Sequence, residues 1–230
     1  MAITAANKTS GKDEADLSTY TTASVAFVAN RLYLFTYGSH GPAPTVATAN
    51  GTGLTIEQVN TVTNASTKRL TVFRALPGAD TTTTVNFVQS ASQVQSHGFW
   101  AIDEYQGMEP GANGLTAVVQ AANNQTAGAT SLTVTLAAFG SVNNAAYGAF
   151  LRSENENMTE GAGFTALAEV TGASSPTTSI LTENKLNDNT VDCSWASSGA
   201  GFGIGIEVKA AVAGGETVLD PFGMTGFFGS

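Results

Sequence analysis

The stretch from Lys68 to Gly107 constrains the fold most, because it contains three runs, 69–75, 82–89 and 97–105, in which side chains alternate along the chain. Successive side chains of a strand point to opposite faces of a sheet. Leu70 and Val72 therefore share one face, and Phe73 lies on the other. Pro77 and Gly78 between the runs are typical of a tight turn. The stretch predicts the central meander of an antiparallel β-sandwich.

Similar runs continue on both sides of this stretch, giving about twelve strand candidates separated by loops rich in Gly, Asn, Ser and Thr. No window keeps an apolar stripe at helical spacing, because β-branched residues and Gly interrupt each one. Many short strands predict an all-β fold, specifically an antiparallel two-sheet β-sandwich of jelly-roll type. The further strands are expected at 24–29, 31–37, 53–59, 115–121, 131–138, 145–152, 164–170, 179–182, 190–196 and 201–211.

The two ends of the chain differ from this pattern. Residues 1–17 are small, polar and charged, which predicts a flexible N-terminal arm before a sandwich domain at 18–212. Residues 213–230 form a Gly-rich and Phe-rich tail whose apolar side chains would be adhesive if left in water. Two interpretations stay open: the tail folds back on its own sandwich, or it docks on an adjacent subunit. The expected partner contacts are Leu219, Phe222, Met224, Phe227 and Phe228.

Charge and cysteine content restrict the classes of partner and the cell compartment that are expected. The net charge is −9, and the nine Lys and Arg residues are dispersed, so no cationic cluster for nucleic acid is expected. The chain has no apolar run of about 20 residues and no secretory signal, which predicts a protein that does not enter a membrane and is made in the cytoplasm. The single cysteine, Cys193, is expected to be a small core residue.

Few residues are of types that could catalyse a reaction or bind a metal ion. His40 and His97 lack a nucleophile-elbow motif, and one Cys with two separated His provides no chelating pair. No catalytic residue, cofactor or metal ligand is therefore expected, and the acidic segment 153–160 lacks the pattern of a calcium-binding loop. Asp103 and Glu104 are adjacent in a strand, so they face opposite sides and cannot flank one glycosidic bond.

Two alternatives to a purely structural protein remain. Trp100 and Tyr105 would provide a stacking face for a glycan if they were exposed, although aromatic side chains on such strands more often belong to the core. A glycan-cleaving enzyme would pair Asp103 or Glu104 with an acid from elsewhere in the chain, and no motif identifies that partner.

Four segments carry a family resemblance: KRLTVFRAL, FWAIDEYQGMEPGANG, AVVQAANN and SLTVTLAAFGSVNNAAYGAF. Together they resemble a β-sandwich module of structural proteins of tailed bacteriophages, over about residues 54–170. The resemblance implies a virion protein without catalytic residues, assembled in the host cytoplasm. Decoration proteins of such phage heads are often trimers, so it also implies a homo-oligomer that binds the major capsid protein, with the two chain ends as contacts. A glycan-binding tail or fibre module is the alternative.

Overall fold

The computed structural model describes residues 2–41, 48–64, 67–89, 96–174 and 177–212. As predicted, this part of the chain is all-β and antiparallel; it forms four sheets and one 3-10 turn, η1 (Ala112–Gly114). The strands are β1 (Thr4–Asp13), β2 (Thr19–Thr21), β3 (Val25–Phe27), β4 (Leu32–His40), β5 (Thr48–Asn50), β6 (Glu57–Thr63), β7 (Lys68–Ala75), β8 (Thr81–Thr83), β9 (Asn86–Val88), β10 (His97–Gln106), β11 (Val118–Thr135), β12 (Ala145–Arg152), β13 (Thr159–Glu160), β14 (Thr165–Gly172), β15 (Thr178–Leu186) and β16 (Thr190–Val208).

The first main sheet has the order β1-β10-β4-β7-β6. Strand β4 is buried along its whole length, and its apolar side chains on both faces explain its central position. The predicted meander over 68–107 is wrong, because β7 and β10 both pair with β4 while the run 82–89 is divided between two small sheets. The predicted faces of β7 are confirmed: Leu70 and Val72 enter one core, and Phe73 enters another.

The second main sheet has the order β11-β16-β12-β15-β14, and β13 pairs with β16. It packs on the first sheet around a core to which β16 contributes Phe202, Ile204 and Ile206. Side-chain hydrogen bonds also join the edges of the two sheets. On one side the Asn123 amide donates to Asn60 Oδ1, 2.9 Å away, and on the other the Ser174 hydroxyl donates to Glu14 Oε2 at 3.1 Å.

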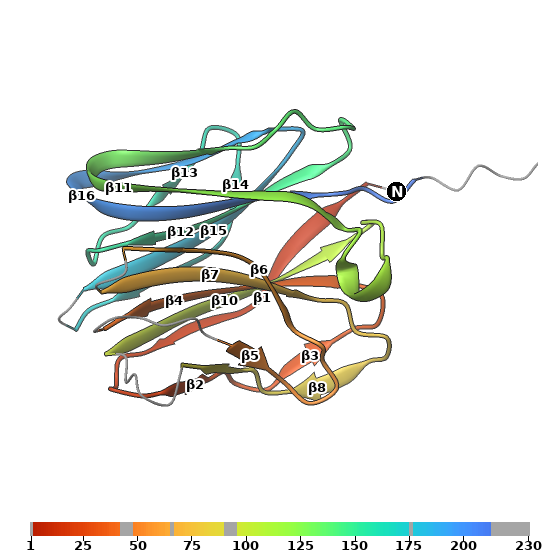
Figure 1. The fold of residues 1–230 in the computed structure, drawn as a ribbon, viewed down its shortest axis with the longest axis horizontal. Coiled ribbons are helices and arrows are strands. Elements are labelled where there is room, and N and C mark those ends of the chain that lie inside the picture. Colours follow the sequence, from red (N-terminus) through yellow and green to blue (C-terminus); the bar gives the residue numbers. More distant parts are fainter. Residues whose placement is uncertain (1, 42–47, 65–66, 90–95, 175–176, 213–230) are drawn as a thin grey trace, which may run out of the picture.

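The outer face of the first sheet is covered rather than exposed. The small sheets β2-β9-β5 and β3-β8 pack against it around a second, aromatic core. Tyr37 and Phe87 stack there with ring centroids 4.7 Å apart. The architecture therefore has more layers than the predicted pair of sheets, and Figure 1 shows the small sheets below the first main sheet and the second main sheet above it. Three-residue strands carry too little alternation to be distinguished from loops in a sequence.

Strands β11 and β16 form one long ribbon that folds over the outside of the second sheet. The sequence predicted two shorter strands in place of each. A bond between the start of β11 and the segment just after it holds the return, since the Gln120 amide donates to Ala137 O at 3.0 Å. Gly203 leaves room for the returning half, since a Cβ there would lie 2.9 Å from Val134 and Phe150 carbons. A third core, with Val134, Phe150 and Trp195 among its members, fills this fold.

The structure bears on the predictions for the two chain ends to different extents. Residues 4–13, expected to belong to a flexible arm, form β1 and pair with β10 over nine residue pairs. A strand needs no apolar face to satisfy the backbone groups of a sheet edge, so this pairing left no signal in the composition. The tail 213–230 lies outside the described residues. Among those described, no helix is long and apolar enough to cross a membrane.

Candidate functional site

A buried carboxylate, Asp103, lies between the two main sheets. Tyr147 donates a hydrogen bond to Asp103 Oδ2 at 2.9 Å, and the Asn7 amide donates to Oδ1 at 2.8 Å. Thr36 Oγ1 lies 2.6 Å from the Tyr147 hydroxyl. Burial raises the pKa of Asp103 to about 6, against these hydrogen bonds, which favour the charged form. The network links β10, β12, β4 and β1 across the core, which is a structural role.

Replacing Tyr147 with Phe tests this role. The substitution removes the hydroxyl, so Thr36 Oγ1 and Asp103 Oδ2 each lose their bond to Tyr147 while Asn7 still donates to Oδ1, which costs about 1–3 kcal/mol. We expect the free energy of unfolding to fall by that amount in urea denaturation. Tyr105→Phe is the matched control, because its hydroxyl donates only to Asn184, on a part-buried bond. Equal stability of Tyr147→Phe and the unmodified chain would contradict the role.

Glu104 lies on the opposite face of the same strand, as the sequence predicted. Tyr33 donates to its Oε2 at 2.6 Å, and Arg31 donates to Oε1 at 2.7 Å. Lys8 lies 3.5 Å from Oε2. Burial raises the pKa of Glu104, but the bonds from Tyr33 and Arg31 and the Lys8 charge outweigh it and hold that pKa below its usual value. Asp103 and Glu104 therefore belong to separate networks and do not form an acid pair.

The rings of Trp100 and Tyr105 both lie in the protein core. Trp100 is buried in the aromatic core, with Gly11 of β1 against its indole. Tyr105 has no exposed surface, and its hydroxyl donates to Asn184 Oδ1 at 2.9 Å. Neither ring offers a face to a glycan in this arrangement.

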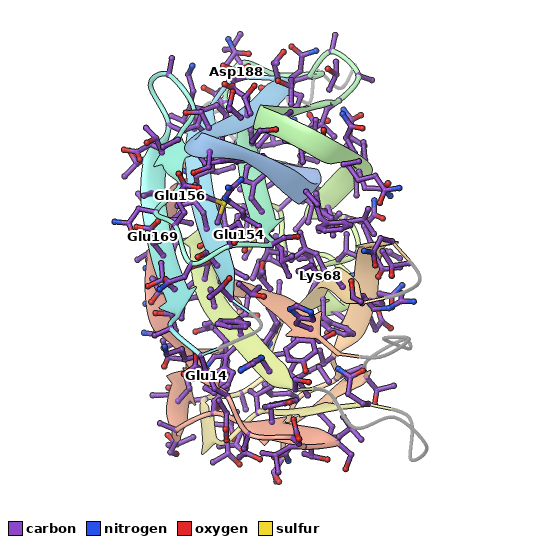
Figure 2. The ribbon with its side chains drawn as sticks, turned by 90° about the vertical axis from the view of Figure 1, so that its left-hand side faces the viewer. Glu14, Lys68, Glu154, Glu156, Glu169 and Asp188 are labelled. Atoms are coloured by element: carbon purple, nitrogen blue, oxygen red, sulfur yellow. The ribbon has the colours of Figure 1, made fainter. Side chains whose placement is uncertain are left out.

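His40 and Lys68 meet at one end of the first sheet, the end that faces the viewer in Figure 2. Burial, with Lys68 and His97 nearby, lowers the pKa of His40 to about 4, so the imidazole is neutral. Its Nε2 accepts from Lys68 Nζ at 3.4 Å, and Nδ1 lies 3.1 Å from Thr178 Oγ1. Thr178 donates its own proton to Thr177 O, so the Nδ1 tautomer satisfies both contacts. The Thr178 hydroxyl thus accepts from His40, whereas the nucleophile of a catalytic triad donates to its His.

Arg152 is fully buried beside the third core. Its guanidinium lies 5.0 Å from the centroid of the Trp195 ring and forms an ion pair with Glu156 at 2.6 Å. Figure 2 shows Glu156 close to Glu154, and both line a pocket of about 390 Å³ with Ser197 and Ser198. This lining is acidic, and the buried Arg152 beside it is already paired with Glu156. The arrangement anchors the segment after β12 to the folded ribbon.

Two other ionisable groups lie in this part of the interior. Glu183 has no exposed surface, and the Gly161 amide donates to its Oε2 at 3.0 Å. Cys193 is buried, as predicted, and burial raises the pKa of its thiol well above the ordinary value. A buried thiol with a raised pKa is unreactive. Within the described ranges, no group of three or more His, Cys, Asp or Glu side chains is placed to hold a metal ion.

An open groove of about 330 Å³ lies at the opposite end of the sheets, where β16 ends and β12 begins. Its buried acid, Glu207, accepts from Asn144 and from Gln120, each at 2.6 Å. The groove is lined by Thr116, Val119, Gly140, Ser141, Asn144, Glu207 and Lys209.

Exposed apolar side chains gather around this groove. Six large apolar side chains are exposed among the described residues, and all except Leu17 lie at this end. Val119 lines the groove, Leu115 and Val142 are next to lining residues in sequence, Leu186 is next to Asn187, whose amide donates to Asn144 O, and Val212 lies three residues after Lys209. We call this surface the apolar end; its exposed members are Leu115 (59%), Val119 (51%), Val142 (68%), Leu186 (47%) and Val212 (81%). The sequence does not predict this surface, because its residues are isolated from one another along the chain.

Comparison of the chain with protein-family models, with curated proteins and with solved structures finds no match in any of the three.

Proposed function

We propose that this chain is a non-enzymatic structural protein of a bacteriophage virion, a decoration or accessory head protein that binds the shell of major capsid protein. The observation that carries the proposal is the apolar end. Five exposed apolar side chains lie at the end of the sheets that holds the open groove, and the last of them, Val212, directly precedes the apolar tail. Clustered exposed apolar surface is typical of a protein interaction site.

The polar clusters support binding over catalysis. Asp103, Glu104 and Glu183 are each buried and held by hydrogen bonds from side chains or backbone. A glycosidase needs two carboxyl groups that flank one open site. The described carboxylates with the most perturbed pKa values, Asp103 and Glu183, lie inside the cores instead.

The assignment to a virion rests on the resemblance over residues 54–170 and on composition. Only 12% of residues are charged, about half of the usual share, and the surface is rich in Thr, Asn, Ser and Gly. Such a surface suits a protein packed beside copies of itself. The jelly-roll classification of the two main sheets belongs to this proposal too. The tail residues Leu219, Phe222, Met224, Phe227 and Phe228 are its proposed contacts.

Immunogold labelling of intact particles with antibody against this chain tests the proposal. We expect label over the whole head, and none with antibody that has been absorbed with the purified chain. Label confined to the tail tip would contradict decoration and favour the adhesin alternative. Unlabelled particles, from cells shown by immunoblot to contain the chain, would contradict a virion protein altogether.

A further inference from the structure

We propose that the apolar end of one copy is the docking site for residues 218–228 of a second copy. This inference rests on the proposed function, which includes self-association, and it adds the two surfaces that would meet. One is the groove together with the exposed apolar side chains of the apolar end. The other is the apolar part of the tail, which contains Val218, Leu219, Phe222, Met224, Phe227 and Phe228.

The strand register places the apolar side chains together. Ala145 pairs with both Val208 and Leu186, and Val118 pairs with Val208, so the start of β11 and the ends of β15 and β16 lie at one end. The loop that contains Val142 leads into β12 at the same end. Separate apolar residues on a surface are ordinary, whereas five gathered at one end of a domain are typical of an interaction site.

The chemistry of the groove fits an apolar segment. Both carboxylate oxygens of Glu207 accept short hydrogen bonds from Asn144 and Gln120. Asn144 Oδ1 in turn accepts from the Ala210 amide at 3.0 Å. The one described cation of the lining, Lys209, is paired with Glu109 at 2.7 Å. With its charged groups satisfied internally, the groove gains free energy on binding mainly by burying apolar surface.

The direction in which the chain leaves the domain favours a second copy over the chain's own groove. Residues 209–211 continue outward beyond β16 as a hydrogen-bonded extension. The Lys209 amide donates to Ala117 O at 2.8 Å, and the Ala211 amide donates to Gly107 O at 2.9 Å. The groove of the same copy is lined by Lys209, so the tail of that copy would have to reverse its direction within a few residues to enter it. A tail of 18 residues spans up to about 60 Å when extended, enough to reach an adjacent copy without reversing.

Such a contact joins two different surfaces of one chain, so each copy donates one tail and receives another. Contacts of this heterologous kind close into a ring when the rotation between copies permits, and a trimer is one such ring. The net charge of −9 on each copy opposes association, whereas apolar contacts do not depend on opposite charges. Added salt screens the repulsion, so self-association should strengthen as ionic strength rises.

Sedimentation velocity of the full chain and its variants tests the inference. The full chain should form oligomers at micromolar concentration. Deletion of 213–230, Val119→Asp and Val142→Asp should each raise the dissociation constant at least about tenfold, the effect of one lost apolar contact. Both valines are half exposed or more, and circular dichroism with thermal melting would verify that the variants fold. Leu17→Asp is the matched control, since it charges an exposed apolar residue away from the apolar end and should leave association unchanged.

Mixing two defective variants identifies the partner surfaces. A chain lacking 213–230 keeps its groove, and Val119→Asp keeps its tail, so the mixture should form a heterodimer that neither variant forms alone. A full chain that stays monomeric while tail deletion raises binding of an apolar dye would overturn the inference in favour of the tail's own groove. Oligomers that still form without residues 213–230 and with Val119→Asp would overturn the inference too. Labelled particles combined with a monomeric full chain would overturn the inference alone, and unlabelled particles combined with tail-dependent oligomers would overturn the proposed virion function alone.

Discussion

Replacing Phe150 with Ala is expected to lower the free energy of unfolding by about 3–5 kcal/mol. Phe150 is fully buried on β12, the central strand of the second sheet, and belongs to the core beneath the folded ribbon. A Cβ on Gly203 would lie 2.9 Å from its ring, so the ring fills the space between sheet and ribbon. Its removal leaves a cavity that a two-stranded ribbon paired along both arms collapses only in part.

Urea denaturation followed by circular dichroism measures this loss. Val142→Ala is the control, because it removes apolar atoms from a side chain that is 68% exposed and should change the free energy of unfolding by less than about 0.5 kcal/mol. If Phe150→Ala lowered the free energy of unfolding as little as Val142→Ala, the folded ribbon would not be packed on the sheet.

Raising the pH from 6 to 9 is expected to destabilise the protein by roughly 2–3 kcal/mol. Burial, with the Asp192 and Glu160 carboxylates nearby, raises the pKa of Glu183 from 4.5 to about 8. Between these two values the folded state binds a proton that the unfolded state has lost. Stability therefore falls as the pH rises through this window, and it stops falling once folded Glu183 has also ionised. The raised pKa of Asp103, about 6, adds a smaller loss below pH 6.

Thermal or urea unfolding at several pH values measures this slope. Glu183→Gln keeps an uncharged group of the same shape and should flatten the dependence between pH 6 and 9. Glu154→Gln, at an exposed carboxylate of the neighbouring segment, should leave the dependence as it is. A Glu183→Gln protein with the slope of the unmodified chain would assign the pH dependence to another group.

The sequence predicts strands wherever alternation runs over six residues or more. Alternation places β7 and β10 close to their expected ranges, and dense apolar runs do the same for β4 and β12. It misses β1, whose residues are polar or small on both faces, since the strand is held by pairing with β10. The folded ribbon left one signal, the alternation of Gly with apolar residues in 201–206, which gives one strand face no side chains and so permits close packing.

The candidate site was less accessible to prediction. The opposite orientation of Asp103 and Glu104 follows from strand geometry alone and is confirmed. The hydrogen-bond partners of these side chains do not follow from strand geometry. Asn7 and Tyr147 lie 96 and 44 residues from Asp103 in the chain and meet it only through strand pairing. The apolar end is assembled in the same way, from loop and strand residues that have no shared pattern in the sequence.

Cosedimentation with particles built from the major capsid protein tests most directly whether this chain acts by binding through its apolar C-terminal segment. Equal amounts of the full chain and of a chain that ends at Val212 would be mixed with the particles, pelleted and quantified. The full chain should pellet with the particles, and the shortened chain should remain in the supernatant while keeping its melting temperature. Equal pelleting of the two chains would contradict a binding role for residues 213–230.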